Sequence, residues 1–230
     1  MTLYETIFAR RSVRKYEDAP LTDAALADVM KRAGGAKQLF GQAARFELAR
    51  KDELKGGQAP YAVLAYGGGD DAARVNIGYV LQGIDLYVQS VGYGSVWCGM
   101  ARPKEPKPDY RILLGFGNAS VPLRSGEAEF KRAGLTDIAD EDNAVARAAR
   151  LAPSAVNFQP WRLTFSEGKV IAAANVRGIG GLLPGKLYLY DLGIITKHVE
   201  IALEHEGFTV TDVKLAGSGK ELTVEVDYAR

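Results

Sequence analysis

The stretch RLAPSAVNFQPWRLTFS, residues 150–166, decides the fold because it joins a helix to a strand through one short loop. The residues that lead into it place apolar side chains on one face of a predicted helix, which Pro153 ends. Beyond Pro160, apolar and polar residues alternate from Trp161 to Phe165, which is the pattern of a strand. The sequence therefore predicts a helix, a rigid loop and a strand in direct succession.

The loop itself carries small and amide-bearing residues, namely Ser154, Ala155, Asn157 and Gln159. Asn and Gln side chains each hold an acceptor oxygen and two donor hydrogens. Two such groups beside backbone amides are able to hydrogen-bond to the edge of a heteroaromatic ring. An ordinary turn closed by two prolines has the same spacing, so the spacing by itself leaves both interpretations open.

The N-terminal stretch IFARRSVRKY, residues 7–16, gathers cations around one hydroxyl group: Arg10, Arg11, Arg14, Lys15 and Ser12. Guanidinium groups bind phosphate in a bidentate fashion, and a serine hydroxyl adds a further hydrogen bond. A solvated basic turn is the plainer interpretation. Nucleic-acid binding is disfavoured because no basic stripe continues beyond the cluster.

The two stretches resemble segments of one known family. APSAVNFQPWRLTF resembles the P-S-x-x-N-x-Q-P-W segment of the nitroreductase-like flavoproteins, and IFARRSVRKY resembles their R-R-S-x-R flavin-phosphate motif. GYGSVWCGM, residues 92–100, resembles the family's G-x-G-T-x-W-x-G segment, whose backbone approaches the flavin. The resemblance extends in order over nearly the whole chain, although only these three segments are specific.

The resemblance implies an α+β fold with a central, mainly antiparallel sheet flanked by helices. It also implies FMN as cofactor and NAD(P)H as electron donor. The expected activity is the ping-pong reduction of a small-molecule electron acceptor, such as a nitroaromatic compound or a quinone. The alternative is a flavin-binding or electron-carrier protein without turnover of its own.

The family's cofactor-binding residues are carried over segment by segment. The phosphate would be held by Arg10, Arg11, Ser12 and Arg14, with Lys131 and Arg132 as a second basic pair. The flavin ring and ribityl chain would be met by Trp97, Cys98, Gly99, Pro153, Ser154, Ala155, Asn157 and Gln159. Core packing is the preferred interpretation for Cys98, and a surface position is the commoner one for Lys131 and Arg132. No residue is predicted to act as a general acid or base.

The second half of the chain repeats the first. DLGIITKHVEIALEHEG, residues 191–207, aligns without gaps on NIGYVLQGIDLYVQSVG, residues 76–92, so that Gly193 matches Gly78. Leu135-Thr136-Asp137 also repeats Leu21-Thr22-Asp23. We interpret this as an internal duplication with halves 1–133 and 134–230, forming two tandem repeats in one compact unit.

The duplication offers an explanation for the distance between the motifs. The first half keeps RRSVR, but its copy of the loop, GGAKQLFGQAAR, lacks the Pro-Ser pair and the Asn. The second half keeps APSAVNFQPW but has no RRSxR before Leu135. Family members are usually homodimers with flavin at the subunit interface, so we expect the two halves to imitate two subunits. The prediction is a monomer that acts as a pseudo-dimer and holds one FMN.

Other periodic stretches fill in the architecture. Helices are predicted over 2–10 and 72–91, and strands over 61–66 and 111–117. The chain ends in a predicted hairpin of residues 208–215 and 221–228, in which Val210 is out of step and suggests a bulge.

Composition limits the partners. The 230 residues carry a formal net charge of +1, which offers no field for nucleic acid or an anionic membrane. A single cysteine, no apolar run near the ~20 residues of a membrane helix, and no signal-peptide pattern favour a cytoplasmic location. The two histidines, His198 and His205, lack the flanking ligands of a metal site.

Overall fold

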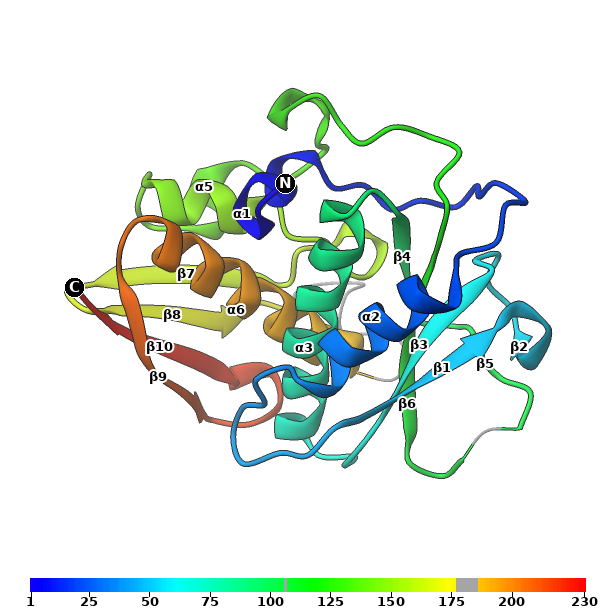
Figure 1. Cartoon of the computed structure of the whole chain (residues 1–230). Coiled ribbons are helices and arrows are strands. Elements are labelled where there is room, and N and C mark those ends of the chain that lie inside the picture. Colours follow the sequence, from blue (N-terminus) through cyan, green and yellow to red (C-terminus); the bar gives the residue numbers. More distant parts are fainter. Residues whose placement is uncertain (106, 177–185) are drawn as a thin grey trace.

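Two four-stranded sheets lie on either side of a central pair of long helices (Figure 1). The computed structural model describes residues 1–105, 107–176 and 186–230. The central helices are α3 (Asp71–Ser90) and α6 (Leu187–His205), and they pack against each other. A short N-terminal helix, α1 (Leu3–Ala9), contacts both of them.

The first sheet belongs to the N-terminal half and is antiparallel throughout. Its strands lie in the order β1 (Arg45–Arg50), β3 (Tyr61–Tyr66), β6 (Tyr110–Gly117) and β4 (Gly94–Cys98). Helices α2 (Asp23–Gly34) and α3 pack on one face, while the short ladder of β2 (Leu54–Lys55) and β5 (Arg102–Pro103) lies on the side of the other. Because both faces are covered, every residue of YAVLAY in β3 is buried.

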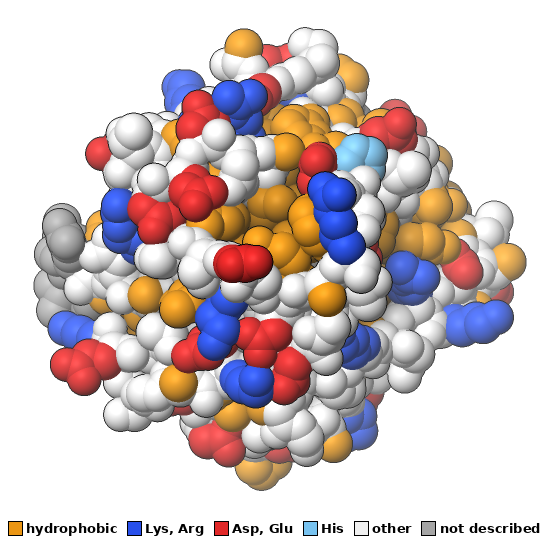
Figure 2. All heavy atoms as spheres, turned by 90° about the vertical axis from the view of Figure 1, so that its left-hand side faces the viewer, with side chains coloured by type: hydrophobic (Ala, Val, Ile, Leu, Met, Phe, Trp, Pro, Cys, Tyr) orange, Lys and Arg blue, Asp and Glu red, His pale blue; other side chains and the backbone are white. Residues whose placement is uncertain are grey.

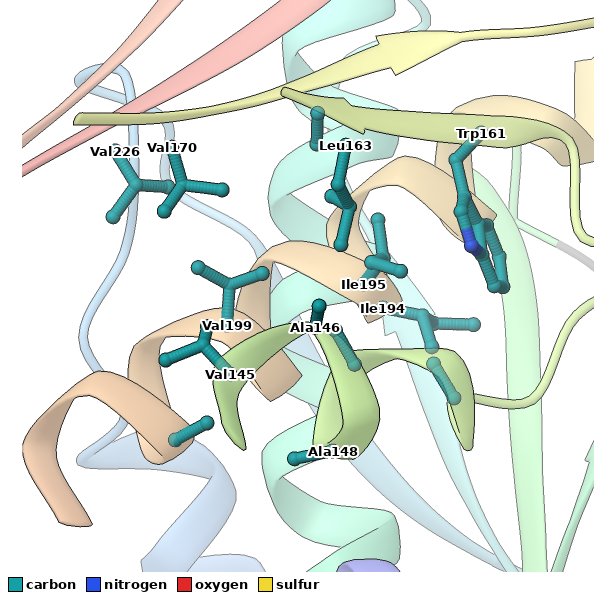
Figure 3. Packing of buried hydrophobic residues seen from close by; sticks show 14 of the residues in the cluster. Val145, Ala146, Ala148, Trp161, Leu163, Val170, Ile194, Ile195, Val199 and Val226 are labelled. Carbon is teal, nitrogen blue, oxygen red and sulfur yellow. The ribbon is translucent and has the colours of Figure 1, made fainter. Parts of the chain in front are cut away.

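The second sheet belongs to the C-terminal half and is also antiparallel. Its strands lie in the order β7 (Trp161–Ser166), β8 (Lys169–Ala174), β10 (Thr223–Ala229) and β9 (Thr209–Ala216). Figure 3 shows Leu163, Val170 and Val226 of this sheet facing apolar residues of α6 and of α5 (Ala144–Arg150). The alternate side chains form ion pairs instead, such as Lys169 with Glu225 at 2.7 Å. Period-two alternation therefore orients this sheet.

The two halves share one topology. In each four-stranded sheet, two strands precede the long helix and two follow it, and the strands lie in the order first, second, fourth, third. The long helices come closest at Gly78 and Gly193. A Cβ atom on Gly78 would lie 2.2 Å from the Tyr190 carbonyl oxygen, and one on Gly193 would lie 2.0 Å from that of Val75. Only glycine permits so close a crossing.

The prediction of one central sheet is wrong, because the strands within residues 1–105, 107–176 and 186–230 form two four-stranded sheets and a two-stranded ladder. Each half completes its own hydrogen-bonded ladder, and the halves meet through helices. The predicted C-terminal hairpin is confirmed as β9 and β10, and β8 pairs with β10 on the side away from β9. The expected bulge is confirmed, since the register shifts between Asp227 and Tyr228, where Val210 pairs.

The repeat is imperfect at the start of the second half. Thr22 caps the twelve-residue helix α2 by accepting a hydrogen bond from the amide of Ala25. The matching segment is interrupted, since the four-residue helix α4 (Leu135–Ile138) is followed after a break by α5. The chain leaves α4 at Ala139, which is extended and bridges to Leu163 of β7. What is one helix in the first half is therefore divided into two in the second.

The face on the left of Figure 1 gathers hydrophobic side chains at its centre, with acidic and basic side chains around them (Figure 2). A small groove in the C-terminal half is lined by residues that include Val145, Phe165, Phe208 and Tyr228. Among the helices that the structure describes, none combines the length and apolarity needed to cross a membrane.

Candidate functional site

One cavity, of about 230 Å³, brings together parts of all three specific segments. From the first half it is lined by Ser12, Arg14, Trp97, Gly99, Met100 and Ile112, and from the second by Pro153, Ser154, Ala155, Val156, Leu187, Tyr190, Asp191 and Ile194. Segments about 140 residues apart in the chain are therefore neighbours in space. An apolar cavity with a few convergent polar groups is typical of cofactor and small-molecule sites.

Two residues at the end of β4, Trp97 and the following Gly99, shape the cavity wall. Trp97 donates a hydrogen bond from Nε1 to Gln82 Oε1, at 3.1 Å, which fixes its ring. A Cβ atom on Gly99 would meet only the Leu187 side chain, at 3.6 Å. The protein's own packing therefore does not demand glycine at position 99, and the room that this glycine leaves adds to the cavity.

The loop of the opening stretch has an unusual backbone. Val156, Asn157 and Gln159 have φ angles of 47°, 59° and 52°, in the left-handed region. This conformation is strained for non-glycine residues, and most of all for a β-branched one. Two hydrogen bonds hold it: the Gln159 amide donates to Ser154 Oγ at 2.8 Å, and the Ala155 amide donates to Asp191 Oδ1 at 3.0 Å.

The two amide side chains of the loop do not line the cavity. Asn157 donates from Nδ2 to the Lys131 carbonyl oxygen, at 2.8 Å, and accepts from Arg132 at its Oδ1. Gln159 accepts at Oε1 from the backbone amide of Ala133, at 2.7 Å. Both side chains thus tie the loop to residues 131–133. Their expected contact with a flavin stays a prediction.

The N-terminal basic cluster divides into two parts. Arg14 is exposed and lines the cavity together with Ser12. Arg10, by contrast, is only 1% exposed and donates from Nε to Asp85 Oδ2 at 2.9 Å. Both arginines were expected to hold the phosphate, but only Arg14 lines the cavity, because Arg10 is buried in its ion pair with Asp85. The segment runs alongside the sheet, where Val13 donates to the Ser95 carbonyl oxygen, and Arg10 lies on its inner side.

A group of arginines lies behind this end of the cavity. Arg10 Nη2 is 3.5 Å from Ser12 Oγ. Arg124 and Arg132 lie over the ring of Phe130, at 4.2 and 5.5 Å from its centroid. Burial, and then the charges of Arg10, Arg124 and Arg150, lower the pKa of Arg132 to about 9. Within the described residues neither Arg124 nor Arg132 has an ion pair, so the group favours a bound anion.

Arg132 and Arg124 differ in whether the sequence predicted them. Arg132 was expected from the resemblance. Arg124 was not, because it stands alone between Leu123 and Ser125 in a loop, and only the fold brings it to Phe130. Arg11 pairs with Glu129 at 3.0 Å, and Lys131 meets the loop through its backbone.

Asp191, at the start of α6, is a residue that the sequence analysis missed. It lines the cavity, is 3% exposed, and uses Oδ1 to accept from the Ala155 amide. Its Oδ2 is buried and has no hydrogen-bond partner among the described residues. Burial raises the pKa of this carboxyl group to about 8. The available signal was the alignment of Asp191 on Asn76, which places an acid where the other half has an amide.

Cys98 and the histidines have structural surroundings. Burial raises the pKa of the Cys98 thiol, which is half-buried and does not line the cavity. Burial lowers the pKa of His198 to about 3, so its ring is neutral. Its Nε2 lies 3.1 Å from Gln82 Nε2. His205 stacks on Tyr4 at 3.6 Å. No group of metal-ligating side chains occurs within the part of the chain that is described.

Comparison with known proteins bears on this site. The family model described as "Putative TM nitroreductase" matches residues 2–203. A solved structure of a "putative nitroreductase" from Thermotoga maritima has 20% sequence identity and a TM-score of 0.72, covering 99% of this chain and 94% of that one. None of the curated proteins matches the chain.

Two shorter solved structures resemble it over part of its length. A nitroreductase family protein from Clostridium difficile has 20% identity and a TM-score of 0.48, covering 60% of this chain and 96% of that one. A "putative nitroreductase in complex with FMN" from Desulfovibrio desulfuricans has 18% identity and a TM-score of 0.46, covering 62% and 98%.

The likeness to the Thermotoga protein extends over nearly all of both chains and establishes a common α+β fold. The family model covers well over half of the sequence, including all three specific segments. The family resemblance expected from the sequence is thereby confirmed. The chain belongs to the family described as "Putative TM nitroreductase", and with it to the nitroreductase group of oxidoreductases.

Proposed function

We propose that the protein is an FMN-dependent oxidoreductase, which takes electrons from NAD(P)H and passes them to a nitroaromatic compound, a quinone or a similar small molecule. One observation carries the proposal. Ser12 and Arg14, from the expected phosphate motif, line the same cavity as Pro153, Ser154 and Ala155, from the expected flavin loop. The family membership agrees with this chemistry.

The residues present fit FMN. Arg14 and Ser12, backed by the arginine group, offer donors suited to a phosphate. Ile112, Leu187 and Ile194 supply apolar walls for a planar ring, and Gly99 leaves room beside them. The volume of about 230 Å³ is below the ~300–1,000 Å³ of most ligand sites, so the enclosed part would hold only a portion of FMN.

FMN, when bound, supplies the hydride chemistry. The chain's own residues bind and orient. Arg14 and Ser12 would anchor the phosphate, and the strained loop, held by Ser154 and Asp191, would keep one wall of the site rigid. The apolar walls would exclude water from a bound ring, which would protect a reduced cofactor from side reactions.

The two halves would act as the two subunits of a family dimer. Three observations support this: the shared strand order, the reciprocal crossing at Gly78 and Gly193, and the complementary loss of motifs. The proposal is therefore one FMN per chain, bound between halves 1–133 and 134–230, in a monomeric protein of the cytoplasm. The net charge of +1 accords with a small-molecule partner rather than nucleic acid or a membrane surface.

The test begins with the purified protein. Flavin absorbance and an FMN titration followed by fluorescence establish whether the cofactor binds. Steady-state oxidation of NADH and NADPH, with and without menadione, then distinguishes an enzyme from a flavin carrier without turnover. Failure to bind FMN would disprove the proposal, and FMN binding without turnover would favour the carrier.

A further inference from the structure

The loops that precede the first strand of each half have the same backbone geometry. Phe40 and Gly41 have φ angles of 57° and 66°, and Val156 and Asn157 have 47° and 59°. A polar residue of the long helix anchors each loop. Asn76 of α3 accepts at Oδ1 from the amide of Leu39, at 2.7 Å. Asp191 of α6 accepts at Oδ1 from the amide of Ala155, at 3.0 Å.

The two anchoring side chains, Asn76 and Asp191, differ at their second polar atom. Asn76 donates from Nδ2 to Gln38 Oε1, at 2.6 Å, so both ends of its amide are satisfied. Counting back from the left-handed pair, the residue in the place of Gln38 is Ser154. Its Oγ already accepts from the amide of Gln159. No hydrogen bond joins this hydroxyl group to Asp191, whose Oδ2 has no partner within the described residues.

The place where Asp191 Oδ2 has no partner among the described residues lies at the cavity. Ser154 is much shorter than glutamine, and both Ser154 and Asp191 line the space that opens there. In the first half the Gln38 side chain occupies the corresponding place and bonds to the backbone of Ala44. A buried polar atom without a partner is costly, unless a ligand supplies one.

The surroundings of Asp191 keep its carboxyl group neutral. Burial raises its pKa to about 8, and only the hydrogen bond from Ala155 acts in the opposite direction. The charged residue that lines the same cavity is Arg14, and the neighbouring titratable group on the helix is Tyr190; neither contributes to the shift. A neutral carboxyl group has one O–H donor, whereas a carboxylate only accepts.

We propose that Asp191 donates a hydrogen bond from Oδ2 to a carbonyl oxygen of the flavin ring, in the place where Gln38 accepts from Asn76 in the first half. The inference rests on the proposed binding of FMN. It implies that the ligand presents a hydrogen-bond acceptor at this wall of the cavity, and not a cation or an N–H donor.

The test compares wild type with Asp191→Asn and Asp191→Leu in titrations with FMN and with riboflavin, which lacks the phosphate. Asn keeps an acceptor for Ala155 and a donor for the ligand, as Asn76 does, so its affinities should stay within about threefold of wild type at pH ~6. Leu should weaken both ligands about tenfold. Equal weakening of riboflavin excludes the phosphate as the group that Asp191 contacts, and the same loss with lumiflavin, which also lacks the ribityl chain, assigns the contact to the ring.

The pH profile gives a second measurement that does not depend on the Leu variant folding. Ionisation removes the donor, so wild-type affinity for riboflavin should fall about tenfold between pH ~6 and pH ~9, while Asp191→Asn should stay level. Asn76→Asp, at the α3 residue that anchors the other loop, is the matched control and should leave both affinities and their pH profile unchanged.

Identical pH profiles for wild type and Asp191→Asn would overturn the inference. So would wild-type riboflavin affinity in a folded Asp191→Leu protein. An altered KM for menadione with unchanged flavin affinity would assign the carboxyl group to the electron acceptor and also refute the contact with flavin. Wild-type protein that binds no FMN would refute the proposed function itself, and this inference with it.

Discussion

Arg10 and Asp85 form a buried ion pair between the N-terminal segment and helix α3, with 1% and 0% of their side chains exposed. Asp85 Oδ2 also accepts from Gln82 Nε2 at 3.1 Å, and Oδ1 accepts from Ser95 Oγ at 2.6 Å. The carboxylate is thus saturated, and the pair fixes the segment that leads to Ser12 and Arg14.

Asp85→Ala should destabilise the protein by about 3–5 kcal/mol, because it leaves Arg10 buried without a counter-charge. Urea unfolding measures the loss. Arg11→Ala breaks the half-exposed pair with Glu129 and should cost at most about 1 kcal/mol. Equal effects of the two changes would show that the buried pair is not a structural anchor.

Arg14→Ala should weaken FMN binding about ten- to hundredfold, since a hydrogen bond to a charged partner contributes ~1.5–3 kcal/mol. Riboflavin, without the phosphate, should bind as before. The melting temperature should not change, because Arg14 is exposed. Lys15→Ala, an adjacent exposed cation that does not line the cavity, is the control. The idea of a phosphate contact fails if Arg14→Ala and Lys15→Ala have the same FMN affinity.

The contrast between Arg10 and Arg14 shows where sequence reasoning stops. The two motifs predicted that Ser12, Arg14 and residues 153–155 belong to one site, because short specific segments preserve their local geometry. All of them line one cavity. The inward turn of Arg10 depends on Asp85, which lies 75 residues away and has no sequence link to it. The charge state of Asp191 depends on burial, which a single acid in an apolar helix does not reveal.

Secondary structure was likewise predicted where the local pattern is strong and missed where pairing with distant residues decides it. YAVLAY and the long periodic helices were predicted because their patterns are strong. KVIAAA, which forms β8, was missed because its alanines have weak strand propensity; pairing with β7 and β10 imposes the strand. The short helix α4 departs from its repeat because Ala139 bridges to Leu163.

Gly78→Ala or Gly193→Ala should prevent stable folding, since the new methyl group would overlap the backbone of the opposite helix. Gly83→Ala, also next to α6 but with its new Cβ 3.6 Å from the Lys197 side chain, is the matched control. It should be neutral or stabilising by up to ~1 kcal/mol, because alanine favours the helix. Circular dichroism melts compare the three, and a well-folded Gly78→Ala protein would contradict the close crossing.

The stability of the protein should depend on pH through Asp191. Its pKa in the folded state is raised from 3.8 to about 8, so its contribution to stability is fully present below pH ~4 and is lost as the pH rises through ~8. Asp191→Asn carries no such loss. The difference in unfolding free energy, Asp191→Asn minus wild type, should therefore increase from pH ~4 to ~8 and then stay level. A constant difference in urea titrations would show that the carboxyl group is not perturbed.

The single-chain arrangement predicts one FMN per monomer, because Arg14 and the loop of residues 153–155 line one cavity within the same chain. Light scattering with flavin counting should give one chain and one flavin. Arg14→Ala and Asn157→Ala should each weaken FMN binding, the second by releasing the loop from the Lys131 carbonyl oxygen. Mixing these two variants should not restore binding, because no intact site forms from parts of two chains. Restored binding on mixing would mean that subunits share the site, and two flavins per chain would mean that the second half retains a site of its own.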